Sequence, residues 1–559
     1  MGSVLIGQSG GGGGTANTKD KTGIGVWSSL KAGLLRLGPS RRHQQPILPE
    51  AAQPLKVIID PELSEVLYRD IGAHYEHTRY FAPSWPYKGI TIAAILTSIS
   101  LILTSLMWLT NIYGNAILKL VSIRNDIDMV FELWRVPPTR PTLSVYIFNY
   151  TNHRKVLEGK EKPHVQEVGP YVFSEKMERI NVQFNSNGTV SFQENRTIVP
   201  DEEKSNGNMN DRVIVPNVPL ITMIKTVNSL YYLDQRLLTQ VVSSADSEPF
   251  QNLSVNEFIW GYEDGFFKIV KKWVNLLTQQ DTKGFGFLNK RRGVHHDIVT
   301  MYTGEYDLET IGQITRWSGN DKIGCWGNTK CDQLAGSDGT MFPAKATSAG
   351  KPLYIYSHGM CRRLPLHFVK TTKSKDGFPV QEYNVAHNLF DFTNNITENE
   401  CYQYKGAYPP TGVFNTGPCQ SDRPIYASFP HFWKGSDELI HSISGLNPDE
   451  SMHKSYFQIH KKLGICLKAK TRFQLNIMLH RAKFVDQTSK MQNETIILPI
   501  GWLDYDSGDL PEHFVNVLHH LTYTVVYVEE TLKWIFLLST ISSLVFFAMK
   551  VRSLIVQPS

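Results

Sequence analysis

Cysteine is absent from most of this 559-residue sequence: none lies in the first 324 residues or in the last 93. No two cysteines form a C-x-x-C pair, and structural zinc sites are usually built from such closely spaced ligands. Clustering in one window is instead typical of disulfides formed in an oxidising compartment. The six are Cys325, Cys331, Cys361, Cys401, Cys419 and Cys466.

The chain also lacks a strong net charge and the usual signatures of catalysis. Its formal charge is +5, and no basic run alternates with aromatics, so nothing indicates nucleic-acid binding. Neither an H-E-x-x-H motif nor a P-loop occurs. The His295–Asp297 stretch offers no third ligand at helical spacing and predicts a surface turn. We therefore expect no enzyme: no catalytic residue, no metal and no cofactor.

Charge is missing altogether from two long apolar runs. Residues 89–118 hold no charged side chain, and about 20 apolar residues suffice for a helix to cross a bilayer. Because 88 residues precede this run, it is not typical of a cleaved signal peptide. The second run, residues 534–549, spans only ~24 Å as a helix. Lys533 and Lys550 flank it and can extend their amines toward the headgroups, so we predict a second span.

Two independent patterns predict the orientation. Residues 1–88 carry ten Lys/Arg against seven Asp/Glu, and basic flanks favour the cytoplasm. All N-x-[ST] sequons lie between the spans, together with every cysteine. The intervening segment is therefore expected outside the cytoplasm. The predicted glycosylation sites are Asn149, Asn187, Asn195, Asn252, Asn395 and Asn493.

The N-terminal tail contains two short patterns. Residues 27–37 place apolar side chains at helical spacing beside basic ones, which fits either a helix on the inner leaflet or a fraying helix in a disordered tail. Residues 68–71, YRDI, have the tyrosine-x-x-bulky form that endocytic adaptors read, although such short patterns are common by chance.

The segment between the spans has a mixed pattern in which strands dominate. Alternating runs at 142–151, 169–184 and 188–199 predict strands, and Gly169-Pro170 predicts a turn before the second of them. Longer apolar repeats at 219–242 and 256–277 predict helices. The fold class expected from these patterns is α+β.

Several blocks in this segment resemble the CD36 family, the class B scavenger receptors. They stand in the family's order between about 140 and 503, so with both spans the resemblance covers nearly everything except the first 85 residues. The blocks are VQEVGPYVF (165–173), IWGYEDGFF (259–267), CDQLAGSDGTMFPA (331–344), MCRRLPLHF (360–368), CQSDRPIYASFPHFW (419–433), GLNPDESMHKSYFQIHKKLG (445–464) and LPIGWL (498–503).

The resemblance implies a fold and two alternative functions. The fold is an antiparallel barrel-like ectodomain with an apical helical bundle and a lipid tunnel that leads toward the bilayer. One function is a receptor that binds lipid or lipoprotein-type ligands and mediates their uptake or transfer. The alternative is a protein-cargo or adhesion receptor of the endolysosomal system, with a protein ligand at the apex. Lys225 and Arg236 are the candidate ligand contacts.

The resemblance also implies a disulfide pattern, Cys331–Cys401 and Cys361–Cys419. The family's Cys-x-Cys is reduced here to CYQY (401–404), so its third bridge cannot form. Cys325 and Cys466 then either pair with each other or stay free.

These inferences give five regions. They are a cytoplasmic tail at 1–88, a transmembrane helix at 89–113, an ectodomain at 114–530, a transmembrane helix at 531–549 and a cytoplasmic tail at 550–559. Because the C-terminal tail, VRSLIVQPS, has no acidic dileucine signal, we expect the plasma membrane, with the endosomal or lysosomal membrane as the alternative.

Overall fold

The computed structural model describes residues 88–124, 128–228, 239–240, 242, 245, 247–269, 271, 284–327, 330–393, 398–482 and 485–556. The two patterns of the N-terminal tail, at 27–37 and 68–71, lie outside the described residues. So do Arg236 and Asn395.

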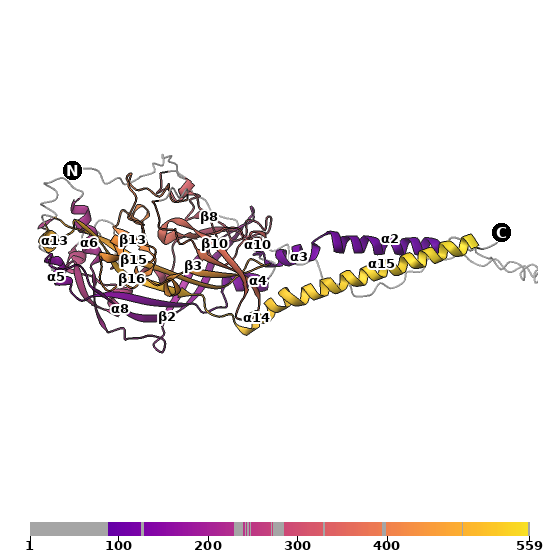
Figure 1. The fold of residues 1–559 in the computed structure, drawn as a ribbon, viewed down its shortest axis with the longest axis horizontal. Coiled ribbons are helices and arrows are strands. Elements are labelled where there is room, and N and C mark those ends of the chain that lie inside the picture. Colours follow the sequence, from indigo (N-terminus) through magenta and orange to yellow (C-terminus); the bar gives the residue numbers. More distant parts are fainter. Residues whose placement is uncertain are drawn as a thin grey trace, which may run out of the picture. The chain divides into compact units, whose positions relative to one another are not determined.

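Two long apolar helices lie at the two ends of the described chain. They are α2 (Lys88–Leu109) and a C-terminal helix made of α14 (Glu512–His519), the π-helical turn η6 (His520–Thr524) and α15 (Val525–Val556). Both are long and apolar enough to cross a membrane. Figure 1 shows α2 and α15 side by side. Two shorter helices, α3 (Ile112–Val121) and α4 (Asp128–Arg135), lead from α2 into the sheet.

The centre of the protein is a 14-stranded antiparallel sheet, whose main path is β8-β7-β3-β2-β1-β16-β15-β14-β11-β10-β9. Strand β6 pairs with β3, and β13 pairs with β12 and β15. A separate pair is β4 (Arg212–Pro216) and β5 (Phe250–Ser254). The strands of the large sheet are β1 (Thr142–Tyr150), β2 (Val165–Asn185), β3 (Thr189–Pro200), β6 (Gly293–Val294), β7 (Val299–Tyr302), β8 (Ile314–Trp317), β9 (Leu353–Ser357), β10 (Arg362–Lys373), β11 (Pro379–Val385), β12 (Val413–Asn415), β13 (Ile425–Ser428), β14 (Tyr456–His460), β15 (Cys466–His480) and β16 (Thr495–Asp506).

A short segment nearly closes this sheet into a barrel. The amide of Ile314 in β8 donates to Gly336 O at 2.9 Å, and the amide of Ser337 donates to Tyr354 O of β9 at 2.9 Å. Residues 336–337 therefore bridge the two edge strands of the main path, which removes most of the exposed edge. The barrel-like antiparallel fold that the family resemblance implies is confirmed.

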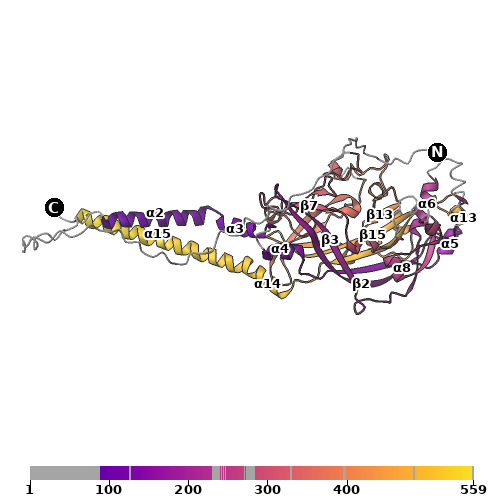
Figure 2. The ribbon, with the colours of Figure 1, turned by 180° about the vertical axis from the view of Figure 1, so that it is seen from behind.

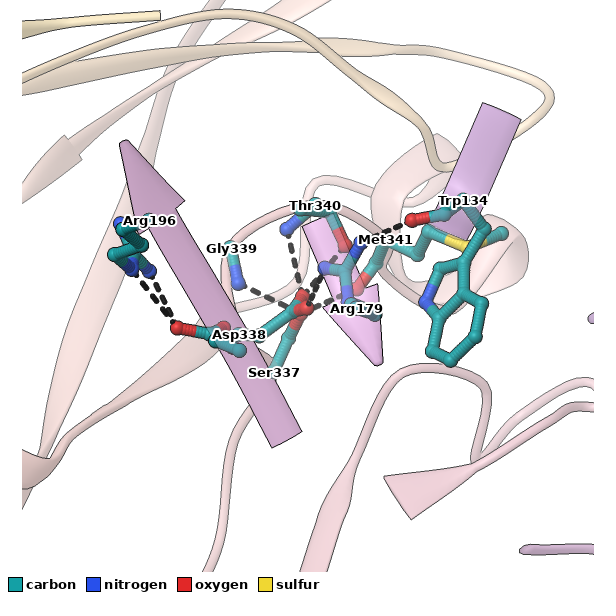
Figure 3. Close-up of polar contacts among 9 residues, drawn as sticks. Trp134, Arg179, Arg196, Ser337, Asp338, Gly339, Thr340 and Met341 are labelled. Carbon is teal, nitrogen blue, oxygen red and sulfur yellow. Dashed lines mark hydrogen bonds and ion pairs between the residues drawn. The ribbon is translucent and has the colours of Figure 1, made fainter. Parts of the chain in front are cut away.

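An ion pair holds the closing segment to β2 (Figure 3). Arg179 of β2 donates to Asp338 Oδ2 at 2.8 Å and also to the carbonyl oxygen of Trp134 at the end of α4. Asp338 Oδ1 accepts from the amide of Thr340 at 2.9 Å, so the turn itself is ordered by the same carboxylate. The Arg179 side chain is 1% exposed and its guanidinium lies 4.8 Å from the Trp134 ring centre.

Three apolar clusters fill the interior. The first lies beneath α6 (Val218–Asn228) and α8 (Val255–Trp260) and includes Ile221, Phe258 and Trp502. The second surrounds Cys331 and includes Trp326 and Phe414. The third packs Val121 of α3, Trp134 of α4 and Leu518 of α14 against β3 and β7. The third cluster thus joins the ends of both spans to the barrel. Figure 2 shows α6 and α8 at the end of the barrel away from α2 and α15, where the apical helices were expected.

Short helices occupy the connections. The α-helical ones are α5 (His153–Leu157), α10 (Ala344–Ser348), α11 (Asp437–His441), α12 (Glu450–His453) and α13 (Asp486–Ser489). The 3-10 turns are η1 (Asn289–Arg291), η2 (Lys330–Asp332), η3 (His358–Met360), η4 (Gly417–Cys419) and η5 (Pro430–Phe432).

Two local predictions differ from the structure, each at a glycine. Gly169-Pro170 forms no turn; both residues lie inside β2 and form a bulge there, opposite Tyr146 of β1. Gly169 has φ 119°, and a Cβ there would meet Val145 O at 2.7 Å, so glycine permits the close approach of the two strands. The helix predicted at 256–277 is interrupted: α8 stops at Gly261 (φ 135°), Tyr262 bridges to Phe285, and helical residues resume at 265–269.

Candidate functional site

The cysteines meet at two places in the second apolar cluster. Cys331 and Cys401 form a disulfide, the pair that the resemblance implies. Cys419 bonds Cys325 and not Cys361, so here the structure departs from the expected pattern. The sulfur atoms of Cys325, Cys361 and Cys419 all lie within 4.8 Å of one another, so the fold gives Cys419 two neighbouring thiols, and the bond is to Cys325. The spacing of the cysteines in the sequence cannot predict whether Cys325 or Cys361 bonds Cys419.

The two remaining cysteines are unpaired thiols. Burial raises the pKa of Cys361 to about 12, and burial also raises the pKa of Cys466 to about 12. Both are therefore protonated and unreactive at neutral pH. Cys325 and Cys466 do not pair with each other.

The predicted sequons differ in accessibility. Asn187, Asn252 and Asn493 are exposed, while Asn149 and Asn195 are half-buried on β1 and β3. The side-chain oxygen of Asn149 accepts from the amide of Ile214 at 2.9 Å. Glycosylation stays a prediction, and the exposed three are the most accessible acceptors among the described sequons.

Lys225, one of the two candidate ligand contacts, is engaged within the protein. It lies on α6, and its amine donates to Asp422 Oδ1 at 2.8 Å and to Asp422 O at 2.5 Å. Burial alone would raise the pKa of Asp422, but the hydrogen bonds from Lys225, Tyr404 and Lys405 together outweigh it and lower that pKa. A ligand anion would have to compete with this carboxylate.

The two spans contact each other through hydroxyl groups. Thr104 Oγ1 lies 2.8 Å from Thr540 Oγ1, and Ser100 Oγ donates to Ser539 Oγ at 3.0 Å. Toward the barrel, Trp108 and Trp534 pack edge to face with ring centres 5.7 Å apart. Interhelical hydrogen bonds of this kind stabilise helix association in a bilayer, and Trp is enriched at its interfaces.

A cavity of about 280 Å³ gathers polar residues to which the sequence analysis gave no role. We call it the Glu167 cavity. Four of the motif blocks supply its walls, although they lie hundreds of residues apart in the chain. Its lining residues are Tyr146, Glu167, His431, Gly445, Asn447, Asp449, Met452, His453 and Trp502.

Glu167 is the central acceptor of this cavity. Its Oε2 lies 2.6 Å from His431 Nε2 and accepts from Trp502 Nε1 at 2.7 Å. Burial alone would raise the pKa of Glu167, but these two hydrogen bonds outweigh it, so the pKa lies below its ordinary value. Glu167 is therefore a carboxylate at neutral pH. Its Oε1 makes no hydrogen bond to the part of the chain that the structure describes.

Both histidines of the cavity are held as neutral imidazoles by backbone amides. The amide of Asn447 donates to His431 Nδ1 at 3.0 Å, and the amide of Asp449 donates to His453 Nδ1 at 3.0 Å. A nitrogen that accepts cannot carry a proton, so each ring has its hydrogen on Nε2. The two rings stack with centres 4.8 Å apart. Burial lowers the pKa of His453 to about 4.

No pattern in the sequence pointed to this cavity. Its polar side chains come from β2, η5, α12 and β16, and each residue type is common in structural roles. Only the register of β1 against β16, which pairs Tyr146 with Trp502, and the turn of 445–449 bring the groups together.

Comparison with known proteins identifies the family. The family model described as "CD36 family" matches residues 91–551. Scavenger receptor class B member 1 of Cricetulus griseus is 27% identical over 437 residues, which cover 78% of this chain and 83% of that protein. The Sus scrofa protein of the same name is 28% identical over 418 residues, covering 74% and 80%. Lysosome membrane protein 2 of Homo sapiens is 26% identical over 422 residues, covering 74% and 84%. Since the family model spans well over half of the chain, this two-span membrane protein belongs to the CD36 family.

Proposed function

We propose that this protein is a receptor that binds lipid or lipoprotein-type ligands outside the cytoplasm and mediates their uptake or transfer to the membrane. Membership of the CD36 family supports the proposal, as do relatives that are named scavenger receptors.

The position of the barrel relative to the spans carries this proposal. Strands β1 and β16 are neighbours in the sheet, with Thr142 paired to Asp506. Helix α4 precedes β1 and α14 follows β16, and both pack into the third apolar cluster. The wall of the barrel is thus fixed directly beside the two spans. A ligand that crossed the ectodomain would leave it next to the bilayer.

The energetics favour an apolar route between the apical helices and the spans. Each methylene that leaves water for an apolar interior contributes about 0.8 kcal/mol. The first cluster lies beneath α6 and α8, and the third contacts α3 and α14. An acyl chain bound against either cluster would be withdrawn from water. This route is the lipid tunnel of the proposal.

The test compares two Val→Trp variants of the full chain. Val299 of β7 is 5% exposed in the third cluster, whereas Val294 of the nearby β6 is 49% exposed. Cells that express each variant receive particles carrying a labelled lipid, and uptake is normalised to surface display. We expect V299W to lose most of the uptake and V294W to retain it. Equal normalised uptake by V299W and the unchanged protein would contradict the proposal.

A second candidate function, a protein-cargo receptor of the endolysosomal system, is favoured by the similarity to lysosome membrane protein 2. Its test is capture of a soluble protein by the delipidated full chain. Surface biotinylation against a lysosomal marker then separates the plasma membrane, which we propose as the resting site, from the endolysosomal alternative.

A further inference from the structure

We propose that the Glu167 cavity is a binding site for a small organic ammonium group of the choline type. This inference does not depend on the proposed lipid function. It rests on the charge, the size and the aromatic lining of the cavity.

The cavity is negatively charged. Glu167 is a carboxylate with Oε1 free of hydrogen bonds to the described residues, and Asp449 is an exposed carboxylate on the rim. Asp449 Oδ1 accepts from the amide of Met452 at 2.9 Å as the N-cap of α12, which leaves Oδ2 available. His431 and His453 are neutral, so neither cancels these charges. The site therefore favours a cation.

Arg472 of β15 does not neutralise the two carboxylates, although its charge acts on Tyr146 and His453 of the lining. Its Nε is 3.2 Å from Asp504 Oδ2. Its Nη1 donates to Lys454 O at 2.8 Å. Arg472 is thus committed to another carboxylate and to a carbonyl. The charge of Glu167 and Asp449 stays available to a ligand.

The lining favours an organic cation over a metal ion. Within the described chain, the one group of three Asp, Glu, His or Cys side chains placed to hold a metal is the cysteine trio. Tyr146 and Trp502 both line the cavity and stack with ring centres 3.9 Å apart, so the half-buried Tyr146 ring, and not the buried Trp502, is the aromatic surface a ligand would meet; Met452 is 55% exposed at the rim. Aromatic faces attract quaternary ammonium groups, and a methionine adapts to their methyls. A cavity of about 280 Å³ holds a headgroup-sized ligand and not a whole lipid.

The experiment is a calorimetric titration of the full chain, solubilised in a maltoside, with choline. The neutral isostere 3,3-dimethyl-1-butanol has the same shape without the charge. We expect saturable binding of choline and none of the isostere. E167Q keeps the acceptor for His431 and Trp502 but removes the charge, and we expect it to weaken choline binding by roughly tenfold or more.

Two further variants distinguish the loss of a charge from a loss of the folded structure. D449N keeps a good N-cap for α12 and removes the second charge, so it should also weaken binding. E161Q is the matched control, because Glu161 is an exposed carboxylate that pairs with Lys155 outside the cavity. It should bind choline as the unchanged protein does. The proposal is overturned if the unchanged protein shows no saturable binding, if the isostere binds equally, or if E167Q and D449N both bind normally.

One more titration identifies the source of the ammonium group. Glycerophosphocholine carries choline as it occurs in a phospholipid headgroup. Binding of it at least as tight as that of choline assigns the site to lipid headgroups. Choline binding with exclusion of glycerophosphocholine assigns it to a free small molecule.

Discussion

His453 and His460 are buried histidines whose hydrogen bonds require the neutral ring. His453 accepts from the amide of Asp449, and His460 Nδ1 accepts from the amide of Leu463 at 3.1 Å. Burial lowers the pKa of each to about 4. An unfolded histidine takes up its proton near pH 6.5, so the unfolded state binds more protons than the folded state between these values.

The free energy of unfolding should therefore fall as the pH falls from about 6.5 to about 4. The expected loss is about 2–3 kcal/mol for each histidine at the lower limit. Thermal unfolding of the solubilised chain across this range measures it, and the double variant H453Q/H460Q should show a shallower pH dependence. H441Q, at an exposed histidine of α11, is the control. An unchanged slope in the double variant would show that these rings do not carry the effect.

The thiols give a second prediction at the level of single residues. Peptide mapping without reduction should recover Cys331–Cys401 and Cys325–Cys419. Cys361 and Cys466 should react with an alkylating reagent much faster after denaturation, because Cys361 is buried, Cys466 is half-buried and burial raises the pKa of each. Recovery of a Cys361–Cys419 peptide would instead support the pairing that the family resemblance implies.

Contacts between individual side chains were the feature that the sequence predicted least well. Glu167 and Trp502 are separated by most of the ectodomain, yet Trp502 donates to Glu167 at 2.7 Å. Such a contact depends on strand register, which the sequence does not specify over that distance. Lys225 was predicted to face a ligand, and its partner Asp422 comes from a loop whose position follows only from the tertiary fold.

At the scale of elements, local pattern predicted more. The alternating runs that became β1, β2 and β3 were recognised because one face of each is buried and period-two patterning results. The apolar runs that became α2 and α15 were recognised from length and absence of charge. The predictions failed where an element is interrupted, as at Gly261, because a backbone break there depends on contacts with the distant residue Phe285.

The buried Arg179–Asp338 ion pair should stabilise the closed form of the barrel. D338N leaves the Arg179 guanidinium buried without its carboxylate, which typically costs about 3–5 kcal/mol. Chemical denaturation of the solubilised chain measures the loss. Asp201 provides the control, because its pair with Lys204 is on the surface and D201N should change little. If D338N unfolds at the same denaturant concentration as the unchanged protein, the pair does not hold the closing segment.

The contact between the spans gives a prediction for α2 and α15. Ser100 and Ser539 lie 3.0 Å apart through their hydroxyl oxygens, so the double variant S100C/S539C should form a disulfide under mild oxidation in membranes. Ile99 and Leu538 are both exposed on the helices, at 50% and 63%, and I99C/L538C serves as the matched control. Equal cross-linking in both variants would indicate that the helices do not pack in this register.

For the whole molecule, the sequence predicted the architecture and the family, but it did not predict how distant segments meet inside the barrel. The two spans, the barrel and the apical helices were all expected, since the motif blocks run through most of the ectodomain. The closing segment at Gly336–Ser337 and the Glu167 cavity were not, because both arise from contacts between segments far apart in the chain.

The orientation of the whole molecule leads to a prediction about its sugars. If the barrel lies outside the cytoplasm, enzymatic removal of N-linked glycans should lower the apparent mass on a gel. Replacing Asn187, Asn252 and Asn493 by Gln should remove most of that shift, because these are the exposed sequons among the described residues. No shift on deglycosylation of the unchanged protein would place the barrel on the other side of the membrane.

The antiparallel pairing of β1 with β16 makes the barrel mechanically sensitive to the distance between its anchors. Thr142 and Asp506 form the rung of this ladder closest to the helices that lead into the spans. If lateral tension in the bilayer drew α2 and α15 apart, the force would act first on the Thr142–Asp506 pair. The two strands would then separate one residue pair at a time, starting from that end. The hydroxyl contacts between α2 and α15 would therefore protect the pairing of β1 with β16 against such separation.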